Sequence, residues 1–402
     1  MMEVWEAKPL GKIVSLQRGF DLPAQSRGEG EIAVIGSNGI VGFHNSLPTD
    51  VPIPGLMLGR SGSVGEITFW NKEYWPLNTV LYVKDFHGND PRFLSFWLQL
   101  FPFKQYAEGV SVPTLNRNSI SDVLFPLPRP EDQEKISAAL TAVETSLKLQ
   151  AEVLLRVREL KRVAMRDLFT RGLRGEKQKE SEIGLIPDSW EPRAILDLCQ
   201  ILSGGTPRKT VQEYWVGEIP WASGKDLKVP TLHDTIDHVS QDGVDAGSRV
   251  APADTVLILV RGMGLAKDLP VAVISRPMAF NQDLKALVSR GEFSGAYVRS
   301  AIYSAKDRLL SRIVPSAHGT MTLNLDDIET FKIPCPSDSD EANEIVRILN
   351  ALDRKIDLHN CKRALVEDLF KSLLHKLMTG EVRVTDLDLS ALDKIPFGGA
   401  AG

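Results

Sequence analysis

The sequence predicts an α+β fold with a pseudo-twofold internal repeat, in which two mixed, strand-rich domains are joined by two long helices that form an antiparallel coiled coil. The first observation is an amphipathic stretch over residues 131–171 that returns over residues 339–379, with apolar residues spaced mostly three or four apart. The second is that a proline-bracketed segment precedes each stretch, Pro126–Pro128 and Pro334–Pro336. The third is length, because about 40 residues form a rod of roughly 60 Å, longer than a domain of this size needs for its own core. Such a long rod needs a partner helix, and the second copy supplies it.

The repeat also predicts where the chain divides. Trp5 and Trp190 start the two copies and are expected to anchor them in the core, and a Thr-Leu-Asn segment closes each copy. The expected segments are a first domain (1–130), a first long helix (131–171), a linker (172–187), a second domain (188–338), a second long helix (339–379) and a C-terminal tail (380–402).

Within each domain, short apolar runs separated by Gly, Pro and Asn predict strands. In the first domain the expected elements are strands at Glu31–Ile35, Leu56–Leu58, Glu66–Trp70 and Val80–Lys84, and a helix at Arg92–Tyr106. In the second they are strands at Ile219–Ala222, Thr255–Val260, Val271–Ser275 and Ala286–Ser289, and a helix at Ser294–Ser311. Asn116 and Asn324 of the Thr-Leu-Asn segments are expected to cap the turns that follow them.

The spacing between the two copies is not constant along the chain. It is 185 residues between the tryptophans and 208 between the asparagines. The copies therefore share their ends and differ inside. Two similar frames with unlike interior loops favour two unlike targets.

Composition restricts the classes of function. The chain of 402 residues is 43% hydrophobic and 25% charged, and no apolar run reaches membrane-spanning length. Cys199, Cys335 and Cys361 are scattered and predict neither a disulfide framework nor a zinc site, which is typical of a cytoplasmic protein. The net charge of −5 does not itself indicate nucleic-acid binding, although a local basic face can still provide it.

The sequence shows no catalytic signature that we recognise. It lacks an Asn-Pro-Pro-Phe or Asp-Pro-Pro-Tyr segment, a phosphate-binding loop with lysine and a zinc-type histidine pair. The glycine-rich run Gly59–Gly65 contains no lysine and is better explained as a turn between strands. We therefore expect no enzymatic activity, no bound cofactor and no metal in this chain.

One segment resembles a known family closely. Ser181–Trp190, Ser-Glu-Ile-Gly-Leu-Ile-Pro-Asp-Ser-Trp, resembles the junction before the second target-recognition domain in specificity (S) subunits of type I restriction-modification systems. Ile35–Asn45 resembles a glycine-rich stretch of the recognition domains of that family. With the duplicated helix, the resemblance covers residues 3–383.

The resemblance implies a role. S subunits carry two target-recognition domains, each of which reads half of a bipartite, asymmetric sequence in double-stranded DNA. Their long helices set the spacer between the halves and scaffold methylation (M) subunits, of which two are expected, and restriction (R) subunits. S-adenosylmethionine, Mg²⁺ and ATP then belong to the partner subunits, and no membrane is involved.

The side chains that contact DNA are expected in the loops, since Arg, Lys, Asn and Gln read bases or phosphates. The candidates are Asn38, His44, Asn45, Arg60, Ser61, Lys72 and Asn78 in the first domain and Arg208, Lys209, Ser223, Lys225, Arg261, Asn281 and His318 in the second. Thr206, Lys267 and Thr320 are further loop residues of the same kind. Arg60 and Arg261 rank first, because each follows an apolar strand beside glycine.

A basic cluster occupies the end of the first long stretch. Between Arg156 and Lys179 there are nine basic residues and three acidic ones. Part of this charge complements the C-terminus of a helix, and the rest could follow a DNA backbone or meet an acidic partner.

Two other functions remain open. One is a coiled-coil adaptor that binds proteins and does not read DNA. Exposed aromatic side chains in the loops would favour this function. The other is an enzyme whose active site lies unrecognised in one domain.

Overall fold

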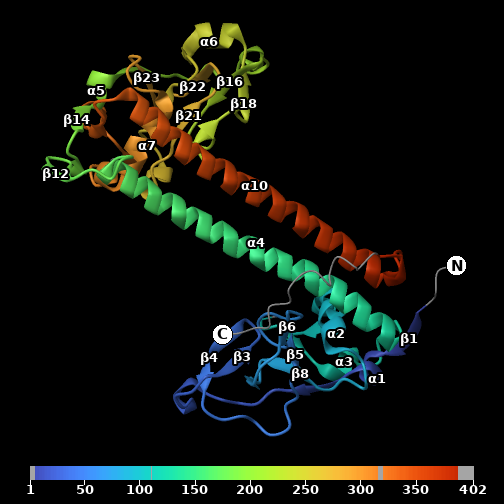
Figure 1. Ribbon diagram of the computed structural model, residues 1–402. Coiled ribbons are helices and arrows are strands. Elements are labelled where there is room, and N and C mark those ends of the chain that lie inside the picture. Colours follow the sequence, from blue (N-terminus) through green and yellow to red (C-terminus); the bar gives the residue numbers. More distant parts are fainter. Residues whose placement is uncertain (1–4, 110, 316–319, 388–402) are drawn as a thin grey trace. The chain divides into compact units, whose positions relative to one another are not determined.

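The computed structural model describes residues 5–109, 111–315 and 320–387 and divides into two compact units (Figure 1). Unit 1 comprises Met1–Ala151 and Cys361–Gly402, and unit 2 comprises Glu152–Asn360. The division falls inside the two long helices, α4 (Pro130–Arg171) and α10 (Ser339–Met378). Each unit therefore contains one strand-rich domain together with about half of each long helix.

Unit 1 is built from short strands with one helix packed on the larger sheet. Before α4 its elements are β1 (Glu6–Pro9), α1 (Leu10–Ile13), β2 (Ser15–Arg18), η1 (Ala24–Ser26), β3 (Ile32–Gly36), β4 (Gly39–His44), β5 (Gly55–Gly59), β6 (Ile67–Trp70), β7 (Tyr74–Pro76), β8 (Val80–Asp85), α2 (Pro91–Trp97), η2 (Leu98–Leu100), η3 (Phe103–Tyr106), β9 (Ala107–Glu108), β10 (Thr114–Leu115), α3 (Arg117–Ser121) and β11 (Leu124–Leu127), and after α10 it has η6 (Val384–Asp386). The larger sheet has the order β2-β8-β5-β6, the smaller has the order β4-β3-β7, and β1 pairs with β11. Helix α2 packs against β5 and β6.

The larger sheet of unit 1 is buried on both faces. Leu56 and Leu58 of β5 contact the cluster that includes α2, whereas Met57 between them belongs to a second cluster on the opposite face. Alternate residues of a strand point to opposite faces, so a strand covered on both sides must be apolar throughout. All five residues of β5 are buried accordingly.

Unit 2 repeats this plan with more elements. Between α4 and α10 its elements are β12 (Gln178–Ser181), β13 (Gly184–Pro187), β14 (Glu191–Ala194), α5 (Ile195–Leu198), β15 (Cys199–Ser203), η4 (Gln212–Trp215), β16 (Ile219–Ala222), β17 (Thr231–Leu232), β18 (Asp237–Val239), α6 (Gln241–Gly247), β19 (Val250–Ala251), β20 (Val256–Leu259), η5 (Met263–Ala266), β21 (Val271–Ile274), β22 (Met278–Phe280), β23 (Leu284–Ser289), α7 (Gly295–Ser304), α8 (Lys306–Leu310), β24 (Val314–Pro315), β25 (Met321–Thr322), α9 (Leu325–Glu329) and β26 (Lys332–Cys335). Its sheets have the orders β15-β23-β20-β21-β17 and β18-β16-β22-β19, and β14 pairs with β26. Helix α7 packs against β20, β21 and β23 (Figure 1).

The element bounds reveal how closely the two units match. The offset is 185 residues for β1 and β14, 187 for β3 and β16, 204 for β6 to β8 against β21 to β23, and 208 for β11 and β26. The strands in the middle of each unit therefore correspond, and the insertions are confined to a few connections. The largest difference lies between β3 and β5, where unit 1 has β4 and unit 2 has β17, β18, α6 and β19. The interior connections thus differ in length, as expected, while the strands between them correspond.

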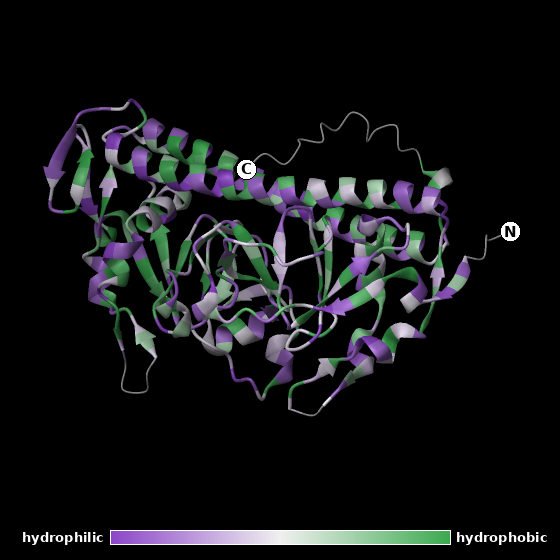
Figure 2. Cartoon of the chain, turned by 90° about the horizontal axis from the view of Figure 1, so that it is seen from below, coloured by the Kyte–Doolittle hydropathy of each residue, from purple (hydrophilic) through white to green (hydrophobic). Residues whose placement is uncertain are grey.

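The long helices pair within each unit. In unit 1, Ile136 and Leu140 of α4 share a core with Leu374 and Leu377 of α10. In unit 2 the late residue Met165 of α4 shares a core with the early residues of α10, and Lys161 is ion-paired with Asp353. Early residues of one helix thus pair with late residues of the other, which is antiparallel packing. Figure 2 shows hydrophobic and hydrophilic residues alternating along both helices, as amphipathic helices require.

The start of each copy is anchored by tryptophan, as predicted. Trp190 is completely buried in the core of unit 2. Trp5 is half-buried and packs on the edge of the core of unit 1.

Two predicted helices are shorter in the structure. The segment expected to be helical from Arg92 ends its α-helix at Trp97, because Pro102 disfavours a helical Phe101, and the chain continues as η2 and η3. The segment expected at Ser294–Ser311 is split at Ala305 into α7 and α8.

The predicted asparagine caps differ from each other. Asn116 caps α3, since its side chain accepts a hydrogen bond from the Asn118 N–H at 3.1 Å. Asn324 occupies the same position before α9, but its amide donates to Asp327 and makes no cap, so that prediction was wrong.

Candidate DNA interface

A pair of polar side chains occurs at the same place in both units. In unit 1, Asn78, just after β7, donates a hydrogen bond to Asp21, just after β2. In unit 2, Thr206, after β15, donates to Gln282, after β22, at 2.5 Å. The offsets of the flanking strands make the two pairs equivalent. The two units thus share the positions of the pair and differ in its groups. Unit 1 pairs a carboxylate with an amide, and unit 2 pairs a hydroxyl with an amide.

Arginines border these pairs. The guanidinium of Arg60 is half-buried and donates to the carbonyl oxygen of Asn78 at 3.3 Å. Arg261 is exposed and forms a backbone bridge with Thr322. Arg60 directly follows β5, and Arg261 lies two residues after the end of β20.

Arg60 and Arg261 do not occupy equivalent positions in the two units. The carbonyl of Arg60 accepts from the N–H of Leu115, and the carbonyl of Val260 accepts from the N–H of Leu323 in the same way. Ser61 forms a bridge with Thr114, as Arg261 does with Thr322. Arg261 therefore corresponds to Ser61.

In unit 1 the turn between β3 and β4 joins the same group. Asn38 in this turn accepts a hydrogen bond from Ser63, which lies in the glycine-rich connection between β5 and β6. The N–H of Ser37 donates to Thr79, next to Asn78, at 3.2 Å. The structure thus brings Asn38, Arg60, Ser61 and Asn78 together.

The equivalent turn in unit 2 follows β16. Lys225 is exposed and forms an ion pair with Asp237 at 2.7 Å, and the hydrogen bond between them raises the pKa of Lys225. A positive charge thus stands where unit 1 has the neutral Asn38. The two faces therefore differ in charge as well as in hydrogen-bonding groups.

Three candidates are engaged inside the fold and are withdrawn as base-reading residues. His44 is 8% exposed, with Nδ1 accepting from the Gly28 N–H at 2.9 Å and Nε2 hydrogen-bonded to Ser46 at 2.8 Å. Ser223 is buried and donates to Asp226 at 2.9 Å. Asn281 is also buried; its amide nitrogen donates to Asp283 at 3.4 Å, and its amide oxygen has no hydrogen-bond partner among the described residues. These three side chains are buried, so they cannot reach a base without a change in the fold.

The remaining candidates are exposed in loops. Asn45 follows β4, Lys72 lies in the turn between β6 and β7, and Arg208 and Lys209 follow β15. His318 lies outside the described residues.

Sequence reasoning missed two residues of this face. Gln282 is the counterpart of Asn78, and the exposed Arg276 is the counterpart of Lys72, both at the offset of 204 that relates β6 to β8 and β21 to β23. Aligning the two copies strand by strand could have found them. The offsets taken from the ends of the repeat, 185 and 208, could not.

Within residues 5–109, 111–315 and 320–387, no group of three or more His, Cys, Asp or Glu side chains is arranged to hold a metal ion. None of the helices in this part of the chain is long and apolar enough to cross a membrane.

Comparisons with known proteins agree with this duplicated arrangement. A family model described as the type I restriction modification DNA specificity domain matches residues 2–158 and 187–368. The type I restriction enzyme EcoR124I/EcoR124II specificity subunit of Escherichia coli is 27% identical over 270 residues, which cover 65% of this chain and 63% of that protein. The MjaVIII specificity subunit of Methanocaldococcus jannaschii is 24% identical over 366 residues, covering 83% of this chain and 80% of that protein.

Coverage varies among the relatives. The chain matches less than two thirds of the length of the E. coli subunit, and it matches 46% of the MjaIX specificity subunit of M. jannaschii.

A solved structure shares the fold. The crystal structure of the type I restriction-modification S subunit from M. genitalium aligns with a TM-score of 0.65 and 16% sequence identity, over 93% of this chain and 96% of that chain. The two mixed strand-and-helix domains, repeated along the chain, are thus confirmed. Since the family model covers both copies, the chain belongs to the family of type I restriction-modification DNA specificity proteins, whose domain it carries twice.

Proposed function

We propose that this chain is the DNA sequence-recognition subunit of a type I restriction-modification complex. Residues 1–130 and 188–338 form its two target-recognition domains, and each reads one half of a bipartite, asymmetric site in double-stranded DNA. The observation that carries the proposal is the equivalent pair of polar sites, Asp21 with Asn78 and Thr206 with Gln282, on a common frame. Side-chain amides can bond adenine through two hydrogen bonds, so a change of neighbour at one position can change the base that is preferred.

The long helices have the role of spacer and scaffold in this proposal. Helices α4 and α10 pair as a coiled coil that fixes the number of unread base pairs between the two halves. Methylation subunits dock on the helices, and restriction subunits join the assembly. A solved structure described as the basis of complex assembly and conformational transition of the type I system shares the fold with a TM-score of 0.55.

Exposed leucines support two equivalent docking sites for methylation subunits. Leu149 and Leu160 of α4 are 49% and 53% exposed, and Leu358 and Leu369 of α10 are 67% and 50% exposed. Leu149 corresponds to Leu358 and Leu160 to Leu369, because each leucine of α4 lies 209 residues before its counterpart in α10, the offset of the repeated helices. Large apolar side chains left exposed at repeated positions favour two copies of the same partner.

In this proposal the chain has no catalytic role, and methylation and cleavage take place on its partners. We also propose a cytoplasmic location. The three free cysteines and the absence of a membrane-spanning helix from the described residues are consistent with this location.

One observation favours the adaptor function as a second candidate. Strand β4 exposes Ile40 and Phe43, at 48% and 53%, beside Asn38 and Asn45. Exposed apolar and aromatic side chains are frequent at protein-binding surfaces.

A single experiment separates the two functions. The chain is co-expressed with the methylation subunit of its own system, and modified adenines are mapped across the host DNA by single-molecule sequencing. Methylation at one split, asymmetric motif supports DNA recognition. An intact complex that binds S-adenosylmethionine and yet methylates no motif contradicts it and favours the adaptor.

A further inference from the structure

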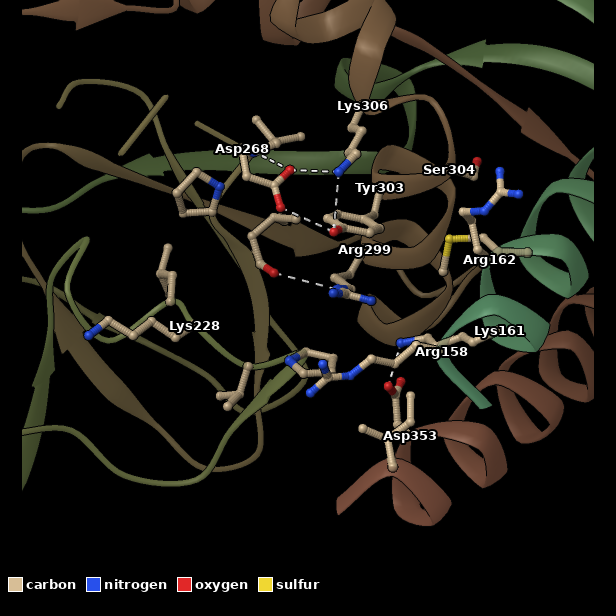
Figure 3. Close-up of a pocket in the computed structure, with 18 of the residues that line it drawn as sticks. Arg158, Lys161, Arg162, Lys228, Asp268, Arg299, Tyr303, Ser304, Lys306 and Asp353 are labelled. Atoms are coloured by element: carbon tan, nitrogen blue, oxygen red, sulfur yellow. Dashed lines mark hydrogen bonds and ion pairs between the residues drawn. The ribbon is translucent and has the colours of Figure 1, made fainter. Parts of the chain in front are cut away.

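Unit 2 contains a basic cleft outside the candidate DNA interface. It has a volume of about 910 Å³ and lies among the second half of α4, helices α7 and α8, and the loops that precede β17 and β21 (Figure 3). Small-molecule sites commonly measure about 300–1,000 Å³. The cleft is thus large enough for an organic ligand.

The centre of the cleft is occupied by Arg299 of α7. Its side chain is 8% exposed, and its guanidinium lies 4.8 Å from the ring centre of Tyr303. Within the described part of the chain, its only side-chain hydrogen bond runs from Nε to the carbonyl of Val271, at 3.4 Å, and no carboxylate forms an ion pair with it. A nearly buried cation of this kind requires a compensating anion.

Two of the three acidic residues that line the cleft are engaged by other cations, and the third, Asp307, is exposed. Asp353 is ion-paired with Lys161, and Asp268 is ion-paired with Lys306 at 2.7 Å. Figure 3 shows these two pairs on either side of Arg299. Arg158 and Lys228 are exposed cations that also line the cleft. The cleft therefore carries an excess of positive charge.

The same place in unit 1 is built differently. At the offset of 209, Lys161 corresponds to Phe370 and Asp353 to Glu144, and at the offset of 204, Arg299 corresponds to Ser95. There Phe370 packs against Phe96 with their ring centres 6.0 Å apart. The frame is thus compatible with an aromatic filling at this place.

Charge is also balanced at that place in unit 1. Glu144 neutralises the guanidinium of Arg92 at 2.5 Å, and Arg92 in turn lies 4.3 Å from the ring centre of Phe96. In unit 2 the corresponding carboxylate, Asp353, forms its ion pair with Lys161, and Asp353 and Asp268 act on Arg299 without an ion pair. The repeated fold therefore does not require an open basic cleft, and unit 2 has acquired one.

We propose that this cleft binds a phosphate-bearing small molecule of nucleotide size. Its phosphates contact Arg299 in the interior and Arg158 and Lys228 at the rim. Its uncharged part lies against the apolar wall formed by Leu227, Leu269 and Pro270. Arg299 is only 8% exposed. A phosphate of duplex DNA is linked on both sides within a wide double helix, so it enters a cleft less readily than the terminal phosphate of a small molecule does. This proposal does not rest on the function proposed above.

The test measures binding of ATP, ADP, AMP and inorganic phosphate to the full-length chain by equilibrium dialysis. We expect ATP and ADP to bind more tightly than AMP and phosphate, because several cations line the cleft. Arg158→Glu should weaken ATP binding at least tenfold. The matched control is Arg156→Glu, an exposed arginine of α4 that does not line the cleft, and it should change the affinity less than twofold.

The proposal is overturned if the folded chain binds none of these probes at millimolar concentration. It is also overturned if Arg158→Glu leaves ATP binding unchanged, or if phosphate binds as tightly as ATP. Loss of DNA affinity or of methylation-subunit affinity in Arg158→Glu, with no nucleotide binding in the parent chain, would assign the cleft to DNA or to a partner protein instead. Arg299→Met provides a second variant, in which weaker ATP binding at an unchanged melting temperature supports the proposal.

Discussion

Trp190 donates its indole N–H to Glu341 across 3.2 Å in the interior of unit 2. The other carboxylate oxygen of Glu341 accepts from the backbone N–H of Leu173 at 2.8 Å. The Glu341 carboxylate, in the first turn of α10, thus binds two other segments. These are Trp190, which starts the second copy, and the backbone at Leu173, just after α4. The contact links three segments that are distant in sequence.

Replacing Glu341 should therefore destabilise unit 2. Glu341→Ala leaves the N–H of a completely buried Trp190 unpaired, and we expect a loss of about 2–3 kcal/mol in the unfolding free energy of unit 2. Glu341→Gln keeps one acceptor and should cost less. Native-state hydrogen exchange, read on peptides of unit 2, measures the loss. The control is Glu344→Ala, whose side chain is 44% exposed and pairs only with Arg347 among the described residues, and which should cost below about 1 kcal/mol.

The polar pairs predict separate effects on the two halves of the DNA site. Gln282→Ala should relax the preference at one or two base pairs of a single half, and Asn78→Ala should do so in the other half. Loss of one bidentate contact costs about 1–3 kcal/mol of discrimination, or roughly five- to 150-fold. Mapping of methylated adenines reads both halves at once. Gln241→Ala, whose amide is bonded to Asp245 on α6, serves as control. An effect of Gln282→Ala on both halves would contradict the assignment of one half to each domain.

The length of the helices should set the spacer of the DNA site. Inserting four residues after Gln150 and four after His359 adds one turn, about 6 Å, to both α4 and α10. At about 3.4 Å per base pair, the spacer should lengthen by one or two base pairs. An insertion in one helix alone should lower the yield of complex, because the paired apolar stripes then fall out of register. An active complex with both insertions and an unchanged spacer would refute the role of the helices as spacer.

The basic residues at the end of α4 and just after it should contribute to the salt dependence of DNA binding. Arg171, Arg174 and Lys177 are exposed, and each phosphate contact adds about 0.9 to the slope of log affinity against log salt concentration. Reversing all three charges should therefore lower the slope of the complex by up to about 3. The control is Arg347→Glu, since Arg347 is paired with Glu344, and this variant should leave the salt slope unchanged. An unchanged slope in the triple variant would remove these residues from the DNA contact.

The cysteines should differ in reactivity and in their effect on stability. Burial raises the pKa of Cys199 to about 11 and that of Cys335 to about 12, whereas Cys361 is exposed. At pH 8 iodoacetamide should therefore modify only Cys361 in the native chain and all three in denaturant, and Cys361→Ser should abolish the native reaction.

The same two thiols set a sign for the pH dependence of stability. An unfolded cysteine loses its proton near pH 9.0, while the buried ones keep theirs, so unfolding releases protons above that pH. The two buried thiols therefore contribute their full stabilisation below about pH 9. The unfolding free energy should fall as the pH rises from about 9 to 11. Denaturant titrations across this range measure it, with Cys199→Ala showing a smaller decrease.

The sequence by itself determined the repeat, the two long helices and most strands. These features depend on periodicity and on local turn residues, which act within a few positions of one another. The strand Ile219–Ala222 was predicted with the bounds that β16 has in the structure. Helix α2 was predicted too long, because the apolar pattern continues past Trp97 while Pro102 interrupts the backbone.

Only the tertiary structure decided which polar side chains are available to a ligand. His44, Ser223 and Asn281 look like loop residues in the sequence, but each is buried in the fold. Gln282 emerged only when strand pairing aligned the two copies. The basic cleft depends on Lys161 reaching Asp353, 192 residues away, and thereby leaving Arg299 without an ion-paired carboxylate. Such pairings are fixed by the packing of distant segments, which no local pattern in the chain encodes.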